Sequence, residues 1–173
     1  IHARLADSFV TSHKLEVLVA DLARLPATAG RGDVDAVIAR HSSEAPPTPL
    51  QHHLALIDRC FAFDTVEEIL AALAADGSDF AKETLALLYS RSALSMKLTL
   101  DLLRAGRRSA SLNECLEREY SATLGMLSND DFYEGVRAAV IDNDRSPKWN
   151  VALADVTPEM LLRFARKDHP PLF

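Results

Sequence analysis

Apolar residues recur along the chain at intervals of three and four positions, the period of an α-helix that buries one face. The rows are Leu15, Leu18, Leu22 and Leu25; Leu50, Leu54, Ile57 and Phe61; Val66, Ile69, Leu70 and Leu73; Leu112, Leu116, Tyr120, Leu124 and Leu127; and Phe132, Val136 and Val140. No alternating pattern of a strand follows the first ten residues. The pattern predicts an all-α chain of about eight or nine helices.

Start and stop signals predict the bounds of several helices. Thr65 and Ser111 are each followed three residues later by a glutamate, which is the spacing of a capping box. Thr157-Pro158 combines a capping residue with a proline at the first helical position. Asp33 is expected to cap a short helix. Asp76-Gly77 is expected to end the helix that begins after Thr65, because glycine commonly follows a helix C-terminus.

Composition places the chain among soluble globular proteins. It has 173 residues, of which 48% are hydrophobic and 25% charged, with a formal net charge of −6. This balance argues against a nucleic-acid-binding face, and no apolar run reaches the roughly 20 residues that span a bilayer. Cys60 and Cys115 stand alone in helical patterns, so we expect reduced cysteines and a cytoplasmic setting. Abundant alanine and the excess of arginine over lysine point to a GC-rich bacterial source.

The residue types that usually carry chemistry have simpler explanations here. His52 and His53 are adjacent, so on a helix they point about 100° apart and do not face one metal ion. The acidic residues stand at helix starts or on polar faces, where they serve as caps and solvated charges. Cys115 has no base within its predicted helix. The residues alone therefore predict no catalytic group and no metal site in this chain.

Three features are unusual. Lys97 lies in an otherwise apolar helix, where the simplest explanation is a side chain that extends to solvent. Gly135 lies inside a helix at a cost of about 1 kcal/mol relative to alanine, which is tolerable if another backbone packs close there. Trp149, the single tryptophan, follows Arg145 and Lys148 in a charged loop. An indole in such a loop is expected to be docked against something.

These features lie in segments that resemble a known family. DFYEGVRAAVIDNDRSPKW, residues 131–149, resembles the C-terminal signature of the 3-hydroxyisobutyryl-CoA hydrolase branch of the enoyl-CoA hydratase/isomerase (crotonase) superfamily. SALSMKLTLDLLRAG, residues 92–106, resembles a helix of that branch, with Ala93 in place of the usual proline. Asn143 is a second departure, because the branch often has lysine there. The resemblance runs from about residue 5 to 168.

The resemblance implies a C-terminal helical region of a crotonase-like α/β spiral fold whose N-terminal core is absent. It divides the chain into residues 1–11, the end of the core; residues 12–61, a helical connector that includes the proline-rich segment 42–49; and residues 62–173, a lid or association region. It implies a hydrolase that cleaves 3-hydroxyisobutyryl-CoA in valine breakdown. An enoyl-CoA hydratase/isomerase of unassigned substrate and a non-enzymatic helical interaction module remain alternatives.

By the same resemblance, the catalytic groups lie outside this chain, and Lys97, Arg145, Lys148 and Trp149 are the candidate residues near coenzyme A. Trp149 is expected either to be buried against the catalytic half or to fill the core of the helical half itself. The expected partners are an acyl-CoA substrate, the N-terminal core in the same or a separate chain, and further copies in a homo-oligomer. No cofactor is expected besides the coenzyme A that the substrate carries.

Overall fold

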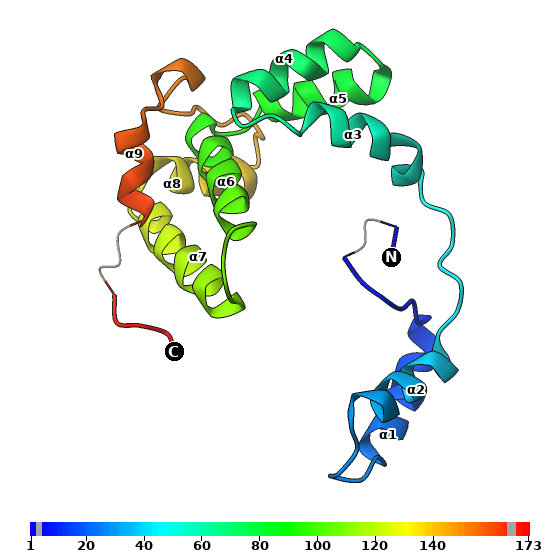
Figure 1. Ribbon diagram of the computed structural model, residues 1–173. Coiled ribbons are helices and arrows are strands. Elements are labelled where there is room, and N and C mark those ends of the chain that lie inside the picture. The colour runs from blue at the N-terminus through cyan, green and yellow to red at the C-terminus, as the bar shows by residue number, and fades with distance from the viewer. Residues whose placement is uncertain (3–4, 166–168) are drawn as a thin grey trace. The chain divides into compact units, whose positions relative to one another are not determined.

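A computed structural model describes residues 1–2, 5–165 and 169–173 (Figure 1). Over these residues the secondary structure is helical and contains no strand. The chain forms two compact units, Ile1–Ala55 and Leu56–Phe173, which are described separately as unit 1 and unit 2.

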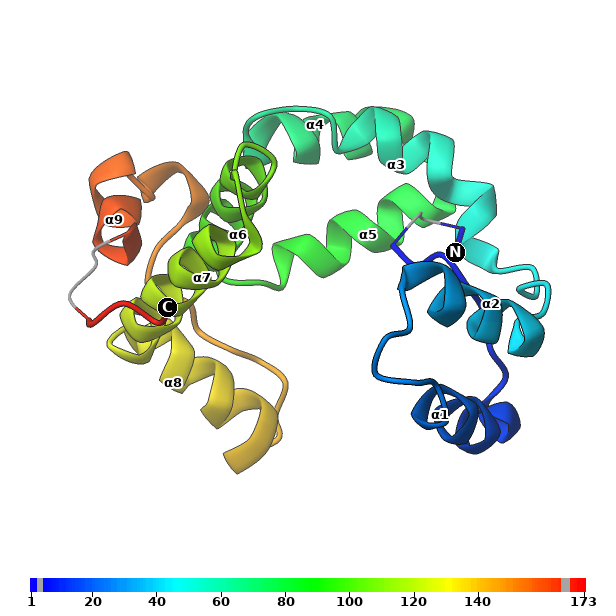
Figure 2. The ribbon, with the colours of Figure 1, turned by 60° about the horizontal axis from the view of Figure 1, so that its bottom comes forward.

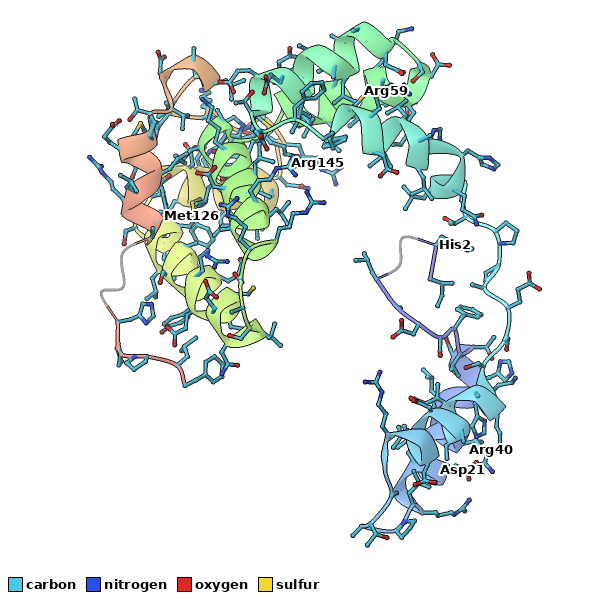
Figure 3. The ribbon with its side chains drawn as sticks, in the orientation of Figure 1. His2, Asp21, Arg40, Arg59, Met126 and Arg145 are labelled. Atoms are coloured by element: carbon cyan, nitrogen blue, oxygen red, sulfur yellow. The ribbon has the colours of Figure 1, made fainter. Side chains whose placement is uncertain are left out.

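Unit 1 is built on two short helices that pack against each other. Its elements are a 3-10 turn at Ser12–Lys14, α1 (Leu15–Ala23), α2 (Arg31–His41) and a 3-10 turn at Pro49–His53. Asp21 on α1, labelled in Figure 3, pairs with Nε2 of His41 at 2.9 Å. Gly30 is the cap of α2, whereas Asp33 lies in its first turn and accepts a hydrogen bond from the Gly30 N–H. The prediction that Asp33 caps this helix was therefore wrong by one turn.

Unit 2 contains the longer helices and two small cores. Its elements are α3 (Leu54–Cys60, which starts at the end of unit 1), α4 (Val66–Asp76), α5 (Asp79–Tyr89), α6 (Ala93–Gly106), α7 (Leu112–Leu127), α8 (Asp130–Val136) with a π-helical turn (Arg137–Ile141), and α9 (Pro158–Leu162) between 3-10 turns at Leu153–Asp155 and Arg163–Ala165. One core joins α3, α4 and α5, and the other joins α6, α7 and α9 (Figure 2).

Most of the local signals act as the sequence predicts. The hydroxyls of Thr65, Ser111 and Thr157 each accept a hydrogen bond from the backbone N–H three residues later. Gly77 ends α4 with φ of +65°, a left-handed conformation that glycine adopts without steric cost. Local sequence is therefore sufficient to set these ends.

The apolar row that predicts α7 is not its buried face. Leu112, Leu116, Tyr120, Leu124 and Leu127 are 37% to 71% exposed. The residues that α7 buries are instead the small Ser121 and Ala122. The small residues let α6 and the 3-10 turn that holds Phe164 approach α7 closely.

Two helical glycines differ in the space around them. This difference predicts that replacing each with alanine has opposite effects on the stability of unit 2. A Cβ on Gly135 meets the Trp149 ring at 3.5 Å, an ordinary contact, whereas a Cβ on Gly125 meets Cδ1 of the buried Phe164 at 2.7 Å. We expect Gly135→Ala to stabilise unit 2 by up to about 1 kcal/mol through helix propensity. Gly125→Ala should cost about 1–3 kcal/mol through overpacking. Urea denaturation of both variants measures the difference, and stabilisation by both would contradict it.

Candidate functional site

The segment after α8 is an ordered loop rather than a linker. Helix α8 continues into the π-helical turn Arg137–Ile141, which closes when the Asp142 N–H donates to the Arg137 carbonyl at 2.8 Å. Asn143 and Arg145 then adopt left-handed φ values of +51° and +54°. The Arg145 N–H donates to the Ala138 carbonyl at 2.9 Å, so the chain folds back over the helix end. A left-handed arginine is unfavourable by itself, so other contacts must hold the loop.

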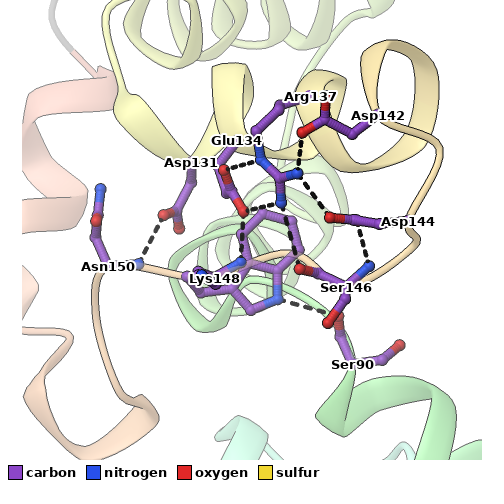
Figure 4. Close-up of polar contacts among 10 residues, drawn as sticks. Ser90, Asp131, Glu134, Arg137, Asp142, Asp144, Ser146, Lys148 and Asn150 are labelled. Atoms are coloured by element: carbon purple, nitrogen blue, oxygen red, sulfur yellow. Dashed lines mark hydrogen bonds and ion pairs between the residues drawn. The ribbon is translucent and has the colours of Figure 1, made fainter.

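Arg137 provides those contacts, because its guanidinium lies at the centre of the loop (Figure 4). Nε and Nη2 donate to the two carboxylate oxygens of Glu134, each at 2.8 Å. Nη1 donates to Asp142 at 2.5 Å and to Asp144 at 2.7 Å. Nη2 also reaches the Ser146 carbonyl at 3.4 Å. The two-pronged pairing with Glu134 is the strongest geometry available between arginine and a carboxylate.

The loop lowers the pKa of two carboxyl groups. The pKa of Glu134 falls to about 2, first because Arg137 donates to its carboxylate and second because the Lys148 N–H also donates to it, at 2.6 Å. Arg137 is also the main reason that the pKa of Asp144 lies below its usual value, and the Ser146 N–H adds to this effect. The pKa of Arg137 is raised by the same three carboxylates. Glu134, Asp144 and Arg137 are therefore charged at neutral pH.

Trp149 lies between α8 and the end of α5. Its Nε1–H donates to the Ser90 carbonyl at 3.0 Å, and its half-buried ring lies against Gly135. The residue that packs close to Gly135 is therefore this indole rather than another backbone. The ring contacts the helical part itself, but Trp149 belongs to neither of its two cores, so it does not fill the core as one expectation had it. Its burial against a catalytic half stays a prediction.

A buried carboxylate holds the chain just after Trp149. Asp131, 4% exposed, accepts from the Ser92 hydroxyl at 2.5 Å and from the Asn150 N–H at 3.1 Å. The same Ser92 hydroxyl accepts the Ser95 N–H and so caps α6. The loop is thus fixed at its start by Arg137 and at its end by Asp131.

Arg145 and Lys148 present their side chains on the exposed surface of this loop. Neither side chain forms a hydrogen bond or ion pair with any residue that the structure describes, although the Lys148 backbone is held by Glu134. Two cations without close partners, on an ordered backbone, are suited to bind an anion. This arrangement offers electrostatic binding but no nucleophile or general base.

Lys97 lies on α6 and not on the loop that holds the other three candidate residues. Its ammonium is paired with Glu67 at 2.7 Å and donates to the Val156 carbonyl at 3.3 Å, so its side chain is only 18% exposed. This pairing is the main reason that the pKa of Glu67 is lowered. Lys97 borders a cavity of about 710 Å³ between α6, α7 and α9, which none of the three loop candidates lines. The structure brings together Arg145, Lys148 and Trp149, but not Lys97.

Other chemistry is sparse in the described part of the chain. Cys60 is buried, Cys115 is half-buried, and both are free thiols. Over residues 1–2, 5–165 and 169–173, no group of three or more His, Cys, Asp or Glu side chains is placed to hold a metal ion. Within the same residues, no helix is long and apolar enough to cross a membrane.

Comparison with known proteins identifies the family. A family model described as enoyl-CoA hydratase/isomerase matches residues 1–165. The chain belongs to this family. It is 39% identical over 165 residues to "3-hydroxyisobutyryl-CoA hydrolase, mitochondrial" of Homo sapiens, and 38% identical to the protein of the same name in Rattus norvegicus. Each alignment covers 92% of this chain and 42% of the relative.

Two solved structures are similar to this chain. A carnitinyl-CoA dehydratase from Mycobacterium thermoresistibile matches with a TM-score of 0.80 and 31% identity, over 97% of this chain and 46% of that one. An enoyl-CoA hydratase from Rhodobacter sphaeroides 2.4.1 matches with a TM-score of 0.75 and 34% identity, over 94% of this chain and 45% of that one. The chain spans less than half the length of these relatives. The predicted fold class, a helical part of a crotonase-like protein, is confirmed.

The expectation of a bacterial cytoplasmic protein was wrong. The curated relatives from Homo sapiens, Rattus norvegicus and Mus musculus are named as mitochondrial enzymes. An alanine- and arginine-rich composition is a weak guide to source, because it reflects codon usage more than the requirements of the fold.

The low pKa of Glu134 predicts how the loop responds to acid. Since the pKa is lowered from 4.5 to about 2, the stabilisation by ionised Glu134 is complete above about 4.5 and is lost as pH falls through about 2. The free energy of unfolding should therefore differ between the natural protein and Glu134→Gln at neutral pH, and this difference should shrink below pH 4.5. Urea denaturation between pH 7 and pH 3 measures it. Glu83→Gln, at an exposed site on α5, controls for net charge, and a constant difference would contradict the coupling.

Proposed function

We propose that this chain is the C-terminal part of an acyl-CoA thioester hydrolase that converts 3-hydroxyisobutyryl-CoA into 3-hydroxyisobutyrate and CoA in valine breakdown. The observation that supports this most strongly is the 39% identity, over 92% of the chain, to a relative of that name. The branch signature at residues 131–149 supports it further, because this is the segment that forms the ordered loop around Arg137.

Under this proposal the bond-breaking groups belong to the remaining part of the longer protein. Water adds to the thioester carbonyl, backbone amides stabilise the oxyanion, and the C–S bond breaks to release the CoA thiol. A carboxylate assists by accepting a proton from the water and returning it to the departing sulfur. The reaction needs no cofactor other than the CoA carried by the substrate.

The proposed role of unit 2 is to hold the substrate's phosphates at the edge of the CoA cleft. Arg145 and Lys148 supply cations without close partners, and Trp149 fixes the backbone that carries them. Arginine and lysine both bind phosphate, so the chemistry matches. Lys97 stays a weaker candidate, because its ammonium would first have to leave Glu67.

The exposed apolar row on α7 bears on the non-enzymatic alternative. A free-standing adaptor would be expected to cover most of its large apolar side chains, yet Leu116, Tyr120 and Leu124 are exposed in unit 2. Contiguous apolar surface of this kind is typical of a segment that packs against another. We propose the N-terminal core of the longer protein as the first partner and a homo-oligomer as the second.

A second candidate function is hydration or isomerisation of an enoyl-CoA. It is favoured by the two similar structures, which are named as a dehydratase and a hydratase at 31% and 34% identity. These identities are lower than that of the hydrolase relative, so hydrolysis remains the preferred function.

An assay of the full-length protein tests the choice between these reactions. We expect release of free CoA thiol from 3-hydroxyisobutyryl-CoA, measured with a thiol reagent. Hydration of crotonyl-CoA, followed by loss of the enoyl absorbance, is measured in parallel. Hydration without thiol release would reject the hydrolase proposal and leave the hydratase.

The role of the two cations predicts a specific kinetic change. In the full-length enzyme, Arg145→Ala and Lys148→Ala should each raise KM for the acyl-CoA while the melting temperature stays nearly unchanged, because these exposed side chains form no hydrogen bond or ion pair with the described residues. Arg108→Ala, at an exposed site just after α6, controls for the loss of one positive charge. If KM is unchanged in both loop variants, the loop has a structural role only.

A further inference from the structure

The oxygen atoms of the loop of residues 142–149 surround the side chain of Arg137. In some other loops that contain carboxylates, the oxygen atoms surround a metal ion instead. Carboxylates at alternate positions, here Asp142 and Asp144, are typical of loops whose oxygens surround Ca²⁺. In this protein those oxygens, with those of Glu134 and the Ser146 carbonyl, converge on the guanidinium of Arg137 (Figure 4). The cation at the centre of the loop is therefore part of the chain.

The negative charges around Arg137 show how strongly the conformation of the loop depends on its guanidinium. Three carboxylates lie within hydrogen-bond distance of one guanidinium. Without Arg137, Glu134, Asp142 and Asp144 would repel one another, and no other cation among the described residues forms an ion pair with any of them. The conformation also includes the left-handed Arg145, which is unfavourable unless neighbouring contacts hold it.

A continuous set of contacts leads from Arg137 to the exposed end of the loop. Arg137 fixes both oxygens of Glu134, and one of these oxygens accepts the Lys148 N–H at 2.6 Å. The next residue, Trp149, is fixed by its hydrogen bond to the Ser90 carbonyl. Loss of the guanidinium would release Glu134 and, with it, the backbone of Lys148.

We propose that Arg137 is a positioning residue whose guanidinium acts as the internal cation of this loop and sets the places of Lys148 and Trp149. The ordering of the loop follows from the contacts within the chain. Its consequence for acyl-CoA binding rests on the proposed function.

The single tryptophan of the 173-residue chain makes the ordering directly measurable. In Arg137→Gly, the emission of Trp149 should shift to longer wavelength and acrylamide should quench it more strongly, because the indole gains access to water. Guanidinium ion, added far below the concentrations that unfold proteins, should restore both signals, whereas the same concentration of sodium chloride should not. Arg108→Gly is the control, since it also replaces an arginine with glycine but at an exposed site outside the loop.

A conservative variant keeps the test decisive if Arg137→Gly does not fold. Arg137→Lys retains the charge but lacks the two-pronged geometry, so it should retain the far-UV circular dichroism of the natural protein and show a smaller shift of Trp149 emission in the same direction. Emission and quenching identical to those of the natural protein in a folded Arg137 variant would overturn the proposal.

Kinetics of the full-length enzyme separate ordering from substrate binding. If Arg137 acts through Lys148, Arg137→Lys should raise KM for the acyl-CoA without a matching fall in kcat, and the double variant with Lys148→Ala should be no worse than Lys148→Ala alone. Additive increases in KM would overturn the positioning of Lys148. A changed Trp149 emission with no change of KM in any loop variant would reject the proposed CoA contact and leave the ordering role intact.

Discussion

The buried carboxylate of Asp131 is the contact on which the arrangement of α6, α8 and the loop of residues 142–149 depends. It joins the start of α6, the start of α8 and the chain after Trp149, three segments that lie far apart in sequence. A carboxylate that is 4% exposed is tolerated only when its oxygens are hydrogen-bonded, and here both oxygens accept a donor. Because the donors are the Ser92 hydroxyl and the Asn150 N–H, the position of each segment is fixed by the same group.

Helix α8 and its π-helical turn combine this buried anchor with the half-buried network around Arg137. Asp131, Glu134 and Arg137 follow one another at intervals of three residues, so neighbouring side chains in this series lie close together on the helix surface. Asp131 is buried, whereas Glu134 and Arg137 hold the loop. One short helix thus fixes both ends of the segment from 142 to 149. This explains how a sequence with the composition of a linker forms a defined structure.

Sequence patterns predicted the features that depend on neighbouring residues. They did not predict contacts between residues that lie far apart in the chain. The hydroxyl caps and Gly77 act within one helical turn, so their patterns were sufficient. The partner of Lys97 could not be predicted, because Glu67 approaches it from another helix. The role of Arg137 was missed, although its spacing of three from Glu134 and the two aspartates that follow were a usable signal.

The two faces of α7 show why unit 2 is suited to pack against other parts of a protein. A helix that folds alone places its large apolar residues inward and its polar residues outward. In α7 the inward positions are Ser121, Ala122 and Gly125, and Gly125 lies against Phe164. The large residues face outward; of these, Tyr120 contacts the His169 ring at 4.7 Å between centroids. Small residues inside bring the helices close together, and large residues outside provide a second surface for packing. A helix of this kind positions neighbouring parts on both sides, which agrees with a unit whose ordered loop presents the side chains of Arg145 and Lys148 on its surface.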